Sequence, residues 1–343
     1  MGRQGATVRD IASIAGVSAA SVSRALRNPD RVSDRTRALV RDALDRIEES
    51  RTGYAPQCVA TMGCLFVDST SGPRFSGFDA TIWGGLARIA IRHGAEILLM
   101  NTDLRSGGES IAGMIRKRGV GSIAIRCDDN SEPLLDEIAK VNIPAITVAH
   151  KHDHPSVGYV CVSSRESSRE AVEHLTQLGH RRIAFCRNIV NDQDHAERAD
   201  GYLEALSRHG IEPDASMMIS AQPDAEGGAT AINRFLALPK PPTAIYFADP
   251  LPTIGALRRL HELGIRVPEQ MSIVGFDDDN ARSLGCPSYT AVCQNAPMLA
   301  EVAGQYLCRM MLGKLPPQPP RVELDSYLEV NGTTGPPELA AKN

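Results

Sequence analysis

A stretch near the amino terminus, TVRDIASIAGVSAASVSRALRNPDRVSDRTR, constrains the fold more than any other part of the sequence. It has the pattern of two short helices that are separated by a tight turn and followed by a third helix. Thr7, Ser18 and Ser33 are suitable N-cap residues for the three helices. Gly16 tolerates the positive φ that a sharp turn requires. Two short helices that cross over such a turn form a helix-turn-helix.

The second of these helices, predicted over residues 18–26, has an outer surface suited to the major groove of DNA. Its inner face holds Val22, Ala25 and Leu26, whereas the outer face carries small residues and one arginine. A guanidinium can bind guanine O6 and N7 or a phosphate, and small side chains allow close approach. A helical hairpin with solvated arginines is the alternative that the pattern alone leaves open. The candidate DNA-binding residues are Thr7, Ser18, Ala19, Ala20, Ser21, Ser23, Arg24, Asn28, Arg31, Ser33 and Thr36.

The same stretch closely resembles the DNA-binding headpiece of the lactose-repressor (LacI) family. Ser21 replaces a commoner threonine of the family pattern, and Arg27 stands where asparagine is usual. The resemblance implies sequence-specific binding to double-stranded DNA. It also implies that the two headpieces of a homodimer bind a pseudo-palindromic operator. The residues that match the pattern are Thr7, Asp10, Ile11, Ala12, Ala15, Gly16, Val17, Ser18, Val22, Ser23, Arg24, Leu26, Val32, Ser33, Thr36 and Arg37.

Charge is distributed unevenly along the chain. Residues 1–57 contain ten arginines, no lysine and seven acidic residues, so their formal charge is +3. The remainder contains 37 − 10 = 27 basic and 41 − 7 = 34 acidic residues, which gives −7. A basic arm on an acidic body fits a nucleic-acid contact that is confined to one end.

The eight cysteines are scattered, and none forms C-x-x-C or another zinc spacing. We therefore expect reduced, buried thiols. The sequence has no signal peptide and no apolar run of about 18 residues, so we expect a cytoplasmic protein without a membrane span. A length of 343 residues is enough for two or three domains.

From residue 63 onward, short apolar runs alternate with amphipathic segments. Strands that alternate with helices of this length predict right-handed βαβ units, and two such series predict two doubly wound parallel sheets. The predicted strands are 63–68, 95–103, 121–126, 144–150, 181–186, 216–220, 243–248 and 272–277. The predicted helices are 78–93, 108–118, 131–140, 164–178, 195–209, 225–237 and 252–263.

Three further segments extend the resemblance to the LacI family: LTQLGHRRIAF (175–185), ERADGYLEAL (197–206) and GIRVPEQMSIVGFDD (264–278). The fold that it implies is an N-terminal all-α helix-turn-helix headpiece plus an α/β periplasmic-binding-protein-like core of two doubly wound parallel-sheet subdomains. The chain should cross between the subdomains near 160–163, 290–293 and 320–325. The expected divisions are a headpiece at 1–57, a shortened hinge at 58–62 and a bilobal effector-binding and dimerisation domain at 63–335, with lobe 1 at 63–161 and 293–322 and lobe 2 at 162–292 and 323–335.

The segment after the headpiece departs from the family pattern. About five extra residues precede Gly53, and only QCVATM separates Pro56 from the strand that is predicted at Gly63. The family's hinge helix, which wedges a leucine into the minor groove and couples effector binding to DNA affinity, is largely missing. Val59 and Met62 are the candidates for a substitute wedge.

The resemblance places effector contacts at the carboxyl ends of the strands. Arg198 and Asp277 match the family's ligand-binding arginine and aspartate. Arg74, Arg126 and Arg198 could converge on one cleft, and arginine forks suit carboxylate or phosphate better than a neutral sugar. We therefore expect a sugar or, by these arginines, a sugar acid or sugar phosphate, although solvated loop charges are the alternative. The candidate effector-binding residues are Arg74, Phe75, Arg126, His150, Arg198, Asp249, Asp277 and Gln294.

No motif assembles an enzyme site: G-x-S-x-G, a P-loop and H-E-x-x-H are all missing from the sequence. His150, His152 and His154 have a spacing that could bind metal, but a solvated loop is the favoured interpretation. We expect no cofactor, no metal and no membrane partner.

The expected dimer surface lies near 78–92 and 278–284. The alternatives are an effector-binding protein that no longer grips DNA and, less favoured, an enzyme on this fold.

Overall fold

The computed structural model of the chain divides into two compact units, Met1–Val59 and Ala60–Asn343. Within the described residues, no helix combines the length and apolar character needed to cross a bilayer. The described residues are 8–27, 32–33, 36–37, 39–40, 43, 60–67, 77–102, 110–127, 131–189, 193–277, 288–315 and 318–338.

The amino-terminal unit contains the predicted pair of short helices, α1 (Val8–Ala15) and α2 (Ala19–Arg27). Gly16 connects them with a φ of 64°, and a Cβ at this position would meet no heavy atom within 4 Å. The glycine is therefore required by backbone conformation rather than by lack of space. The apolar faces of the helices form a small core of Ile11, Ala15, Val22, Ala25, Val40 and Ala43.

Serine caps begin the second and third helices, as the sequence predicted. The Oγ of Ser18 accepts a hydrogen bond from the Ser21 amide at 3.1 Å. The Oγ of Ser33 accepts one from the Thr36 amide at 3.3 Å. Each cap supplies a side-chain acceptor to the first turn of a helix, and the Ser21 amide also donates to the Ser18 carbonyl at 2.9 Å. Thr7, the predicted cap of the first helix, lies outside the described residues.

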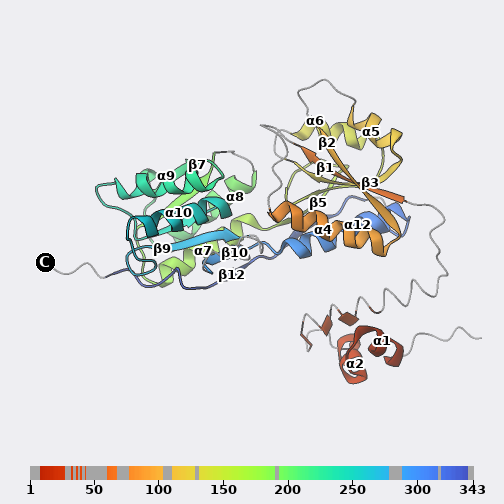
Figure 1. Cartoon of the computed structure of the whole chain (residues 1–343), viewed down its shortest axis with the longest axis horizontal. Coiled ribbons are helices and arrows are strands. Elements are labelled where there is room, and N and C mark those ends of the chain that lie inside the picture. The colour runs from red at the N-terminus through yellow and green to blue at the C-terminus, as the bar shows by residue number, and fades with distance from the viewer. Residues whose placement is uncertain are drawn as a thin grey trace, which may run out of the picture. The chain divides into compact units, whose positions relative to one another are not determined.

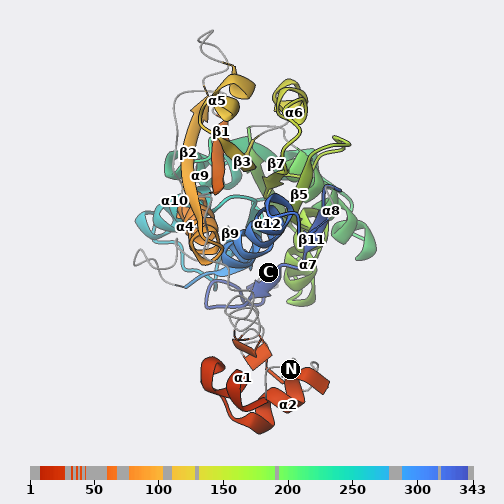
Figure 2. The same ribbon diagram turned by 90° about the vertical axis from the view of Figure 1, so that its right-hand side faces the viewer.

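Lobe 1 is a parallel six-stranded sheet in the order β11-β5-β4-β3-β1-β2 (Figure 1). Its strands are β1 (Ala60–Val67), β2 (Ala95–Thr102), β3 (Val120–Arg126), β4 (Ala145–Val148), β5 (Gly158–Val162) and β11 (Arg321–Leu324). Helices α4 (Gly77–Arg92) and α12 (Ala296–Met311) pack on one face, side by side in Figures 1 and 2. Helices α5 (Ile111–Lys117) and α6 (Glu132–Ala139) cover the other face.

Lobe 2 repeats this plan with the strand order β12-β10-β9-β8-β6-β7. Its strands are β6 (Ile183–Asn188), β7 (Met218–Ala221), β8 (Ala244–Phe247), β9 (Ser272–Asp277), β10 (Thr290–Cys293) and β12 (Tyr327–Glu329). Helices α7 (Ser164–Gln177) and α8 (Gln193–Arg208) share one apolar core with the sheet. Helices α9 (Ala225–Leu236) and α10 (Pro250–Glu262) form the core on the opposite face, and a short 3-10 helix η3 (Ala215–Met217) precedes β7. The expectation of two doubly wound sheets is confirmed.

The chain crosses between the sheets at three places. Ser163 joins β5 to α7, residues 294–295 join β10 to α12, and residues 325–326 join β11 to β12. After the last crossing, β12 runs in the direction opposite to its neighbour β10, so these two strands pair antiparallel. The sequence pattern had not shown β5, β10, β11 or β12 as strands, because each is short and lies beside a crossing rather than inside a regular strand-helix alternation.

The first strand begins earlier than the sequence predicted. Ala60 already pairs with Ala95, so residues 60–62 of the expected hinge belong to the sheet. Met62 is fully buried in the core between the sheet and α4 and α12. The idea that Met62 replaces the family's minor-groove wedge is therefore wrong, because its side chain fills lobe 1. Val59, the other candidate, lies outside the described residues.

Candidate functional site

The outer face of the helix-turn-helix presents small polar groups. Ser18, Ala19 and Ala20 are exposed, whereas Ser21 and Ser23 are half-buried. The hydroxyls of Ser18 and Ser21 lie 2.9 Å apart, so the first turn of α2 offers two adjacent hydroxyl groups. Small groups at the start of a recognition helix permit close approach to base edges and phosphates.

The other predicted DNA contacts are only partly described. Arg24 lies within α2, but its side chain is outside the described part of the structure, as are Thr7, Asn28 and Arg31. Ser33 is exposed and its hydroxyl lies 2.9 Å from that of Thr36, which is half-buried. Their contact with DNA stays a prediction.

The predicted effector residues gather at one edge of each sheet. Strand order reverses between β1 and β3 and again between β6 and β8. In a doubly wound sheet, ligands bind outside the carboxyl ends of the strands at such a reversal. The predicted residues at these ends are Arg126 at the end of β3, His150 after β4, Asp249 after β8, Asp277 at the end of β9 and Gln294 after β10.

Arg126 is engaged within lobe 1. Its Nε donates to the Asp79 carboxylate at 2.9 Å, and Asp79 is a buried residue in the first turn of α4. Its Nη1 donates to the carbonyls of Val148 at 2.9 Å and Ala149 at 3.2 Å. The sequence prediction had treated Arg126 as a positive charge available to the effector. The ion pair with Asp79 compensates that charge, so Arg126 adds less to an anion site than the count of three arginines suggested.

The segment after β4 makes a strained turn that these contacts support. Ala149 has a φ of 54°, a left-handed conformation that non-glycine residues rarely adopt. The Thr147 hydroxyl donates to the His150 carbonyl at 2.7 Å, and Arg126 binds the Ala149 carbonyl. His150 is buried, with 5% of its surface exposed. Strain of this kind is retained where the surroundings determine the local backbone.

The histidines that follow brace their own loop. His152 Nδ1 accepts a hydrogen bond from the His154 amide at 3.1 Å, and its Nε2 lies 3.3 Å from the Gly158 carbonyl. His154 Nδ1 accepts from the Ser156 amide at 3.2 Å. Burial lowers the pKa of His152 to about 4. Among the described residues, no group of three or more His, Cys, Asp or Glu side chains could hold a metal ion.

Arg198 lies in the wall of lobe 2. Its Nη1 donates to the Ala248 carbonyl at 2.7 Å, and its guanidinium lies 3.8 Å above the ring of Phe276. Only 6% of the residue is exposed, and its Nε is buried without a hydrogen-bond partner. Stacking on an aromatic face fixes the plane of the guanidinium. A buried N–H donor that lacks a partner is costly, so this position can gain from an added acceptor.

His195 is a site residue that the sequence reasoning missed. Its Nε2 lies 3.2 and 3.3 Å from the two carboxylate oxygens of Asp249, and 7% of the residue is exposed. His195 precedes Arg198 by three positions, and residues at this spacing share a helix face. From that spacing, the sequence could have indicated His195 as a site residue. The carboxylate of Asp249 is therefore engaged by His195, and Asp249 directly follows Ala248, whose carbonyl accepts from Arg198.

The remaining predicted effector residues are described only in part. Gln294 is half-buried after β10. The backbone of Asp277 pairs with Cys293 at the end of β9, but its side chain is not described. Arg74 and Phe75 lie outside the described residues, so the proposed convergence of three arginines is not tested.

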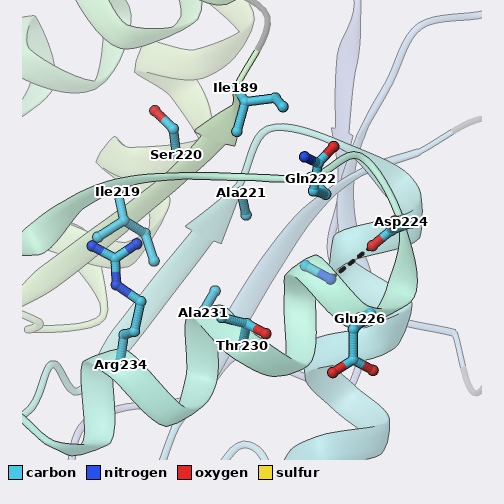
Figure 3. Close-up of a pocket in the computed structure, with 11 residues that line it drawn as sticks. Ile189, Ile219, Ser220, Ala221, Gln222, Asp224, Glu226, Thr230, Ala231 and Arg234 are labelled. Atoms are coloured by element: carbon cyan, nitrogen blue, oxygen red, sulfur yellow. Dashed lines mark hydrogen bonds between the residues drawn. The ribbon is translucent and has the colours of Figure 1, made fainter.

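A cavity of about 290 Å³ opens elsewhere on lobe 2, between the end of β7 and α9 (Figure 3). Ile189, Ile219 and Ala231 form its apolar floor, and Gln222, Glu226 and Arg234 are among its polar residues. None of the predicted effector residues lines it. It lies on the α9 face of the sheet, whereas Arg198 belongs to α8 on the opposite face.

Comparison with protein-family models identifies both parts of the chain. Residues 7–56 match the model described as bacterial regulatory proteins, lacI family. Residues 172–334 match the model of a periplasmic binding protein-like domain. The chain belongs to the LacI family. The LacI-family match covers the helix-turn-helix, and the second match covers most of lobe 2 together with the return through α12 and β11 to β12.

Relatives match this chain along nearly its whole length, and the first of them carries the name of a transcriptional repressor. The chain is 29% identical over 309 residues to the probable HTH-type transcriptional repressor ExuR of Bacillus subtilis, covering 89% of this chain and 91% of the relative. It is 26% identical over 317 residues to catabolite control protein A of Priestia megaterium, covering 89% and 92% of the two chains. This LacI-family chain is therefore a DNA-binding transcriptional regulator.

Solved structures agree with the two-lobed architecture. The transcriptional regulator CelR in complex with cellobiose is 26% identical, with a TM-score of 0.69 over 96% of this chain and 100% of that chain. A LacI family transcriptional regulator from Mycobacterium smegmatis is 27% identical, with a TM-score of 0.66 over 80% and 99% of the two chains.

Proposed function

We propose that this regulator is a cytoplasmic, homodimeric repressor of a pseudo-palindromic operator, controlled by an anionic sugar derivative that binds between its lobes. Repression is supported by the names of the relatives. A dimer suits an operator with two half-sites, because each recognition helix fills one of them. The effector would act through a coupling free energy between the cleft and the headpiece.

The observation that supports an anionic effector is the burial and hydrogen bonding of Arg198. Its guanidinium is buried, its Nε has no hydrogen-bond partner, and the neighbouring carboxylate of Asp249 is engaged by His195. A buried cation favours a ligand that brings a compensating negative charge. A carboxylate or phosphate also matches the fork of the guanidinium better than a hydroxyl does. A sugar acid or a sugar phosphate satisfies both requirements.

The effector class is tested by isothermal titration calorimetry on the full-length chain. The anionic probes are gluconate, glucuronate and glucose 6-phosphate, and the neutral probes are glucose and cellobiose. Cellobiose is included because it is the ligand named in the complex of the similar regulator CelR. We expect at least one anionic probe to bind more tightly than its neutral counterpart. Binding of neutral sugars alone would overturn this part of the proposal.

Operator binding is tested by fluorescence anisotropy with palindromic DNA at several salt concentrations. Arg24→Ala should weaken specific binding about tenfold or more, because a bidentate base contact contributes about 1–3 kcal/mol. Arg258→Ala is the matched control, since this exposed arginine pairs with Glu262 one turn later on α10. Wild-type affinity should fall steeply with added salt. Equal affinity of both variants for the operator would exclude Arg24 as a base-reading residue.

A second candidate function is an effector-binding protein that no longer couples its ligand to DNA. The start of β1 at Ala60 favours it, because the strand takes up residues that the sequence had assigned to the hinge. The two candidates differ in one measurement, the operator affinity with and without a bound effector. An unchanged affinity at saturating effector would support the uncoupled protein.

A further inference from the structure

A lysine after β4 bridges the two lobes. The Lys151 ammonium lies 2.9 Å from a carboxylate oxygen of Glu323 and 3.4 Å from one of Glu197. Glu323 belongs to β11 in the sheet of lobe 1, whereas Glu197 belongs to α8 of lobe 2. The Lys151 and Glu197 side chains are 27% and 20% exposed, so the pair is partly shielded from solvent. One ammonium therefore carries ion pairs to both lobes.

On the side of lobe 1, contacts of Arg321 hold the loop that carries Lys151. The Arg321 guanidinium donates to the carbonyls of His152, Asp153 and His154 and lies over the ring of Tyr159. These contacts tie the loop after β4 to the neighbouring end of β11. The hydrogen bond from Lys151 to Glu323 raises the pKa of the lysine above its ordinary value, which favours the charged ammonium.

On the side of lobe 2, the partner carboxylate lies in the segment that carries the proposed effector residues. Glu197 directly precedes Arg198 and follows His195 by two positions on α8. The Gln193 side-chain amide donates to the Glu197 carboxylate at 3.3 Å, which helps to orient it. A change in the distance between Lys151 and Glu197 therefore moves the wall of the cleft.

We infer that Lys151 is a positioning residue that holds α8 against lobe 1 and so sets how far the effector cleft closes. The inference rests on the proposed function, because it assumes that the effector binds between the lobes. A ligand enclosed by two lobes binds more tightly when the closed arrangement is already populated. Breaking one partly exposed ion pair should weaken effector binding about two- to fivefold.

Two matched variants distinguish the ion pair between the lobes from the ion pair within lobe 1. Glu197→Gln removes only the pair that crosses between the lobes, and Glu323→Gln removes only the pair within lobe 1. Small-angle scattering of the full-length protein without ligand should give a larger radius of gyration for Glu197→Gln than for the wild type and Glu323→Gln. An unchanged radius in Glu197→Gln, or an equal increase in both variants, would overturn the inference. Circular dichroism checks that both variants are folded.

Zero-length carbodiimide crosslinking tests the contact itself without any effector. Mass spectrometry of the digested wild-type protein should detect an amide bond between Lys151 and Glu197, with a lower yield at high salt because the ion pair is screened. If the only crosslink joins Lys151 to Glu323, the bridge does not form in solution.

Calorimetry with glucuronate then measures the consequence for binding. We expect a two- to fivefold higher Kd for Glu197→Gln and a Kd near the wild-type value for Glu323→Gln. Equal Kd values for all three proteins would overturn the role of Lys151 in effector binding. If glucuronate binds none of them, gluconate and glucose 6-phosphate replace it as probes. If none of the three anionic probes binds, the proposed effector class fails, while scattering and crosslinking still decide whether the bridge holds the lobes.

Discussion

At the scale of single residues, Arg198 combines several kinds of contact in one side chain. It hydrogen-bonds to a backbone carbonyl, stacks on Phe276 and keeps a buried N–H without a partner. A planar guanidinium can do all three, whereas the ammonium of lysine cannot stack or present a fixed fork. The arginine is therefore suited to hold an acceptor in a defined orientation.

Arg198→Lys should weaken binding of an anionic effector about tenfold to a hundredfold, because a charge-assisted hydrogen bond contributes about 1.5–3 kcal/mol. Arg187→Lys is the control, since Arg187 is half-buried in the same lobe and donates to the Ser220 hydroxyl at 3.2 Å. Calorimetry with the anionic probe that binds the wild type measures both variants. Equal weakening in the two variants would argue against a direct contact by Arg198.

The histidine loop predicts a dependence of stability on pH. The pKa of His152 is about 4 in the folded chain, below its ordinary value of 6.5, so the unfolded chain takes up a proton first on acidification. The stabilisation from the neutral ring is complete above pH 6.5 and is lost as the pH falls toward 4. His152→Asn keeps an acceptor for the His154 amide but does not titrate. Urea unfolding at pH 7 and pH 4.5 should show a smaller loss of stability in the variant, and equal losses would contradict this reasoning.

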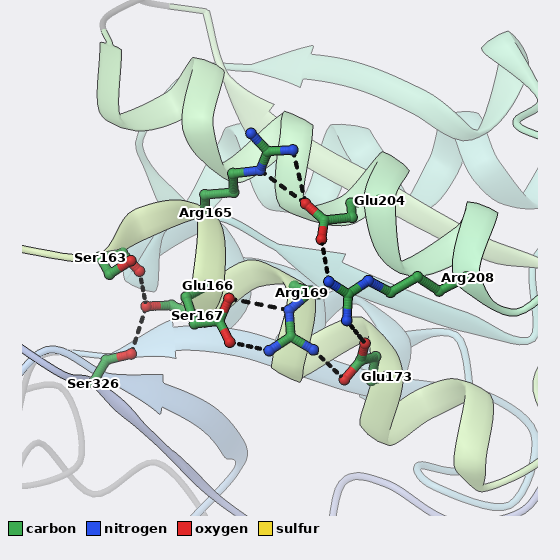
Figure 4. Close-up of polar contacts among 9 residues, drawn as sticks. All are labelled: Ser163, Arg165, Glu166, Ser167, Arg169, Glu173, Glu204, Arg208 and Ser326. Atoms are coloured by element: carbon green, nitrogen blue, oxygen red, sulfur yellow. Dashed lines mark hydrogen bonds and ion pairs between the residues drawn. The ribbon is translucent and has the colours of Figure 1, made fainter.

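At the scale of elements, close helix packing and surface charge both join α7 to α8. Arg169 pairs with Glu166 and Glu173, and Arg208 pairs with Glu173 and Glu204 (Figure 4). The pairs of Arg208, whose side chain is 55% exposed, contribute little individually. Gly201 matters more, because an added Cβ would lie 2.2 Å from the Arg165 carbonyl oxygen. The approach of the helix backbones therefore requires glycine at this position.

Neighbouring glycines on α4 give a matched test of helix packing. A Cβ on Gly85 would lie 2.4 Å from the Cβ of Ala300 on α12, whereas one on Gly84 would meet nothing within 4 Å. Gly85→Ala should destabilise the fold by about 1–3 kcal/mol through overpacking. Gly84→Ala should be neutral or stabilising by about 0.5–1 kcal/mol, because alanine is the better helix former. Chemical denaturation measures both variants.

The double variant Gly85→Ala with Ala300→Gly identifies the cause. Removing the Cβ of Ala300 relieves the clash, so the double variant should recover part of the lost stability. If Gly85→Ala is harmless, or if the second substitution restores nothing, the contact between α4 and α12 is not what requires the glycine.

At the scale of the whole molecule, lobe 1 exposes apolar side chains on α4 and β2. Ile91 on α4 is 73% exposed and Leu99 on β2 is 54% exposed. Ile91 lies within 78–92, where the sequence predicted a dimer surface. We propose that a second copy covers this part of α4, since exposed apolar surface of this kind often marks an interface.

Ile91→Glu should shift the protein from dimer to monomer, because a charge buried at an apolar interface is costly. Operator affinity should fall with it, since a monomer presents one recognition helix instead of two. Light scattering coupled to size-exclusion chromatography measures the mass. Leu263→Glu is the control, because Leu263 is 42% exposed at the end of α10 in lobe 2. Dissociation caused by Leu263→Glu, or a dimer that survives Ile91→Glu, would place the interface elsewhere.

The sequence by itself determined the features that depend on neighbouring residues. Serine caps, the Gly16 turn and the alternation of apolar runs with amphipathic helices are local signals, and they predicted the helix-turn-helix and both sheets. The carboxyl ends of strands also follow from this alternation, so the sequence predicted that Asp249 follows a strand, which the structure shows as β8.

Only the tertiary structure decided which of these side chains are already engaged. Arg126 pairs with Asp79, Asp249 with His195, and Lys151 with Glu197. The two members of each pair lie 46 to 54 positions apart in the sequence, and Lys151 and Glu197 also lie on different lobes. Helical and strand periodicity therefore cannot predict these contacts. Their distances depend on how two twisted sheets orient the elements between them, which is set by packing of the whole core rather than by any local pattern.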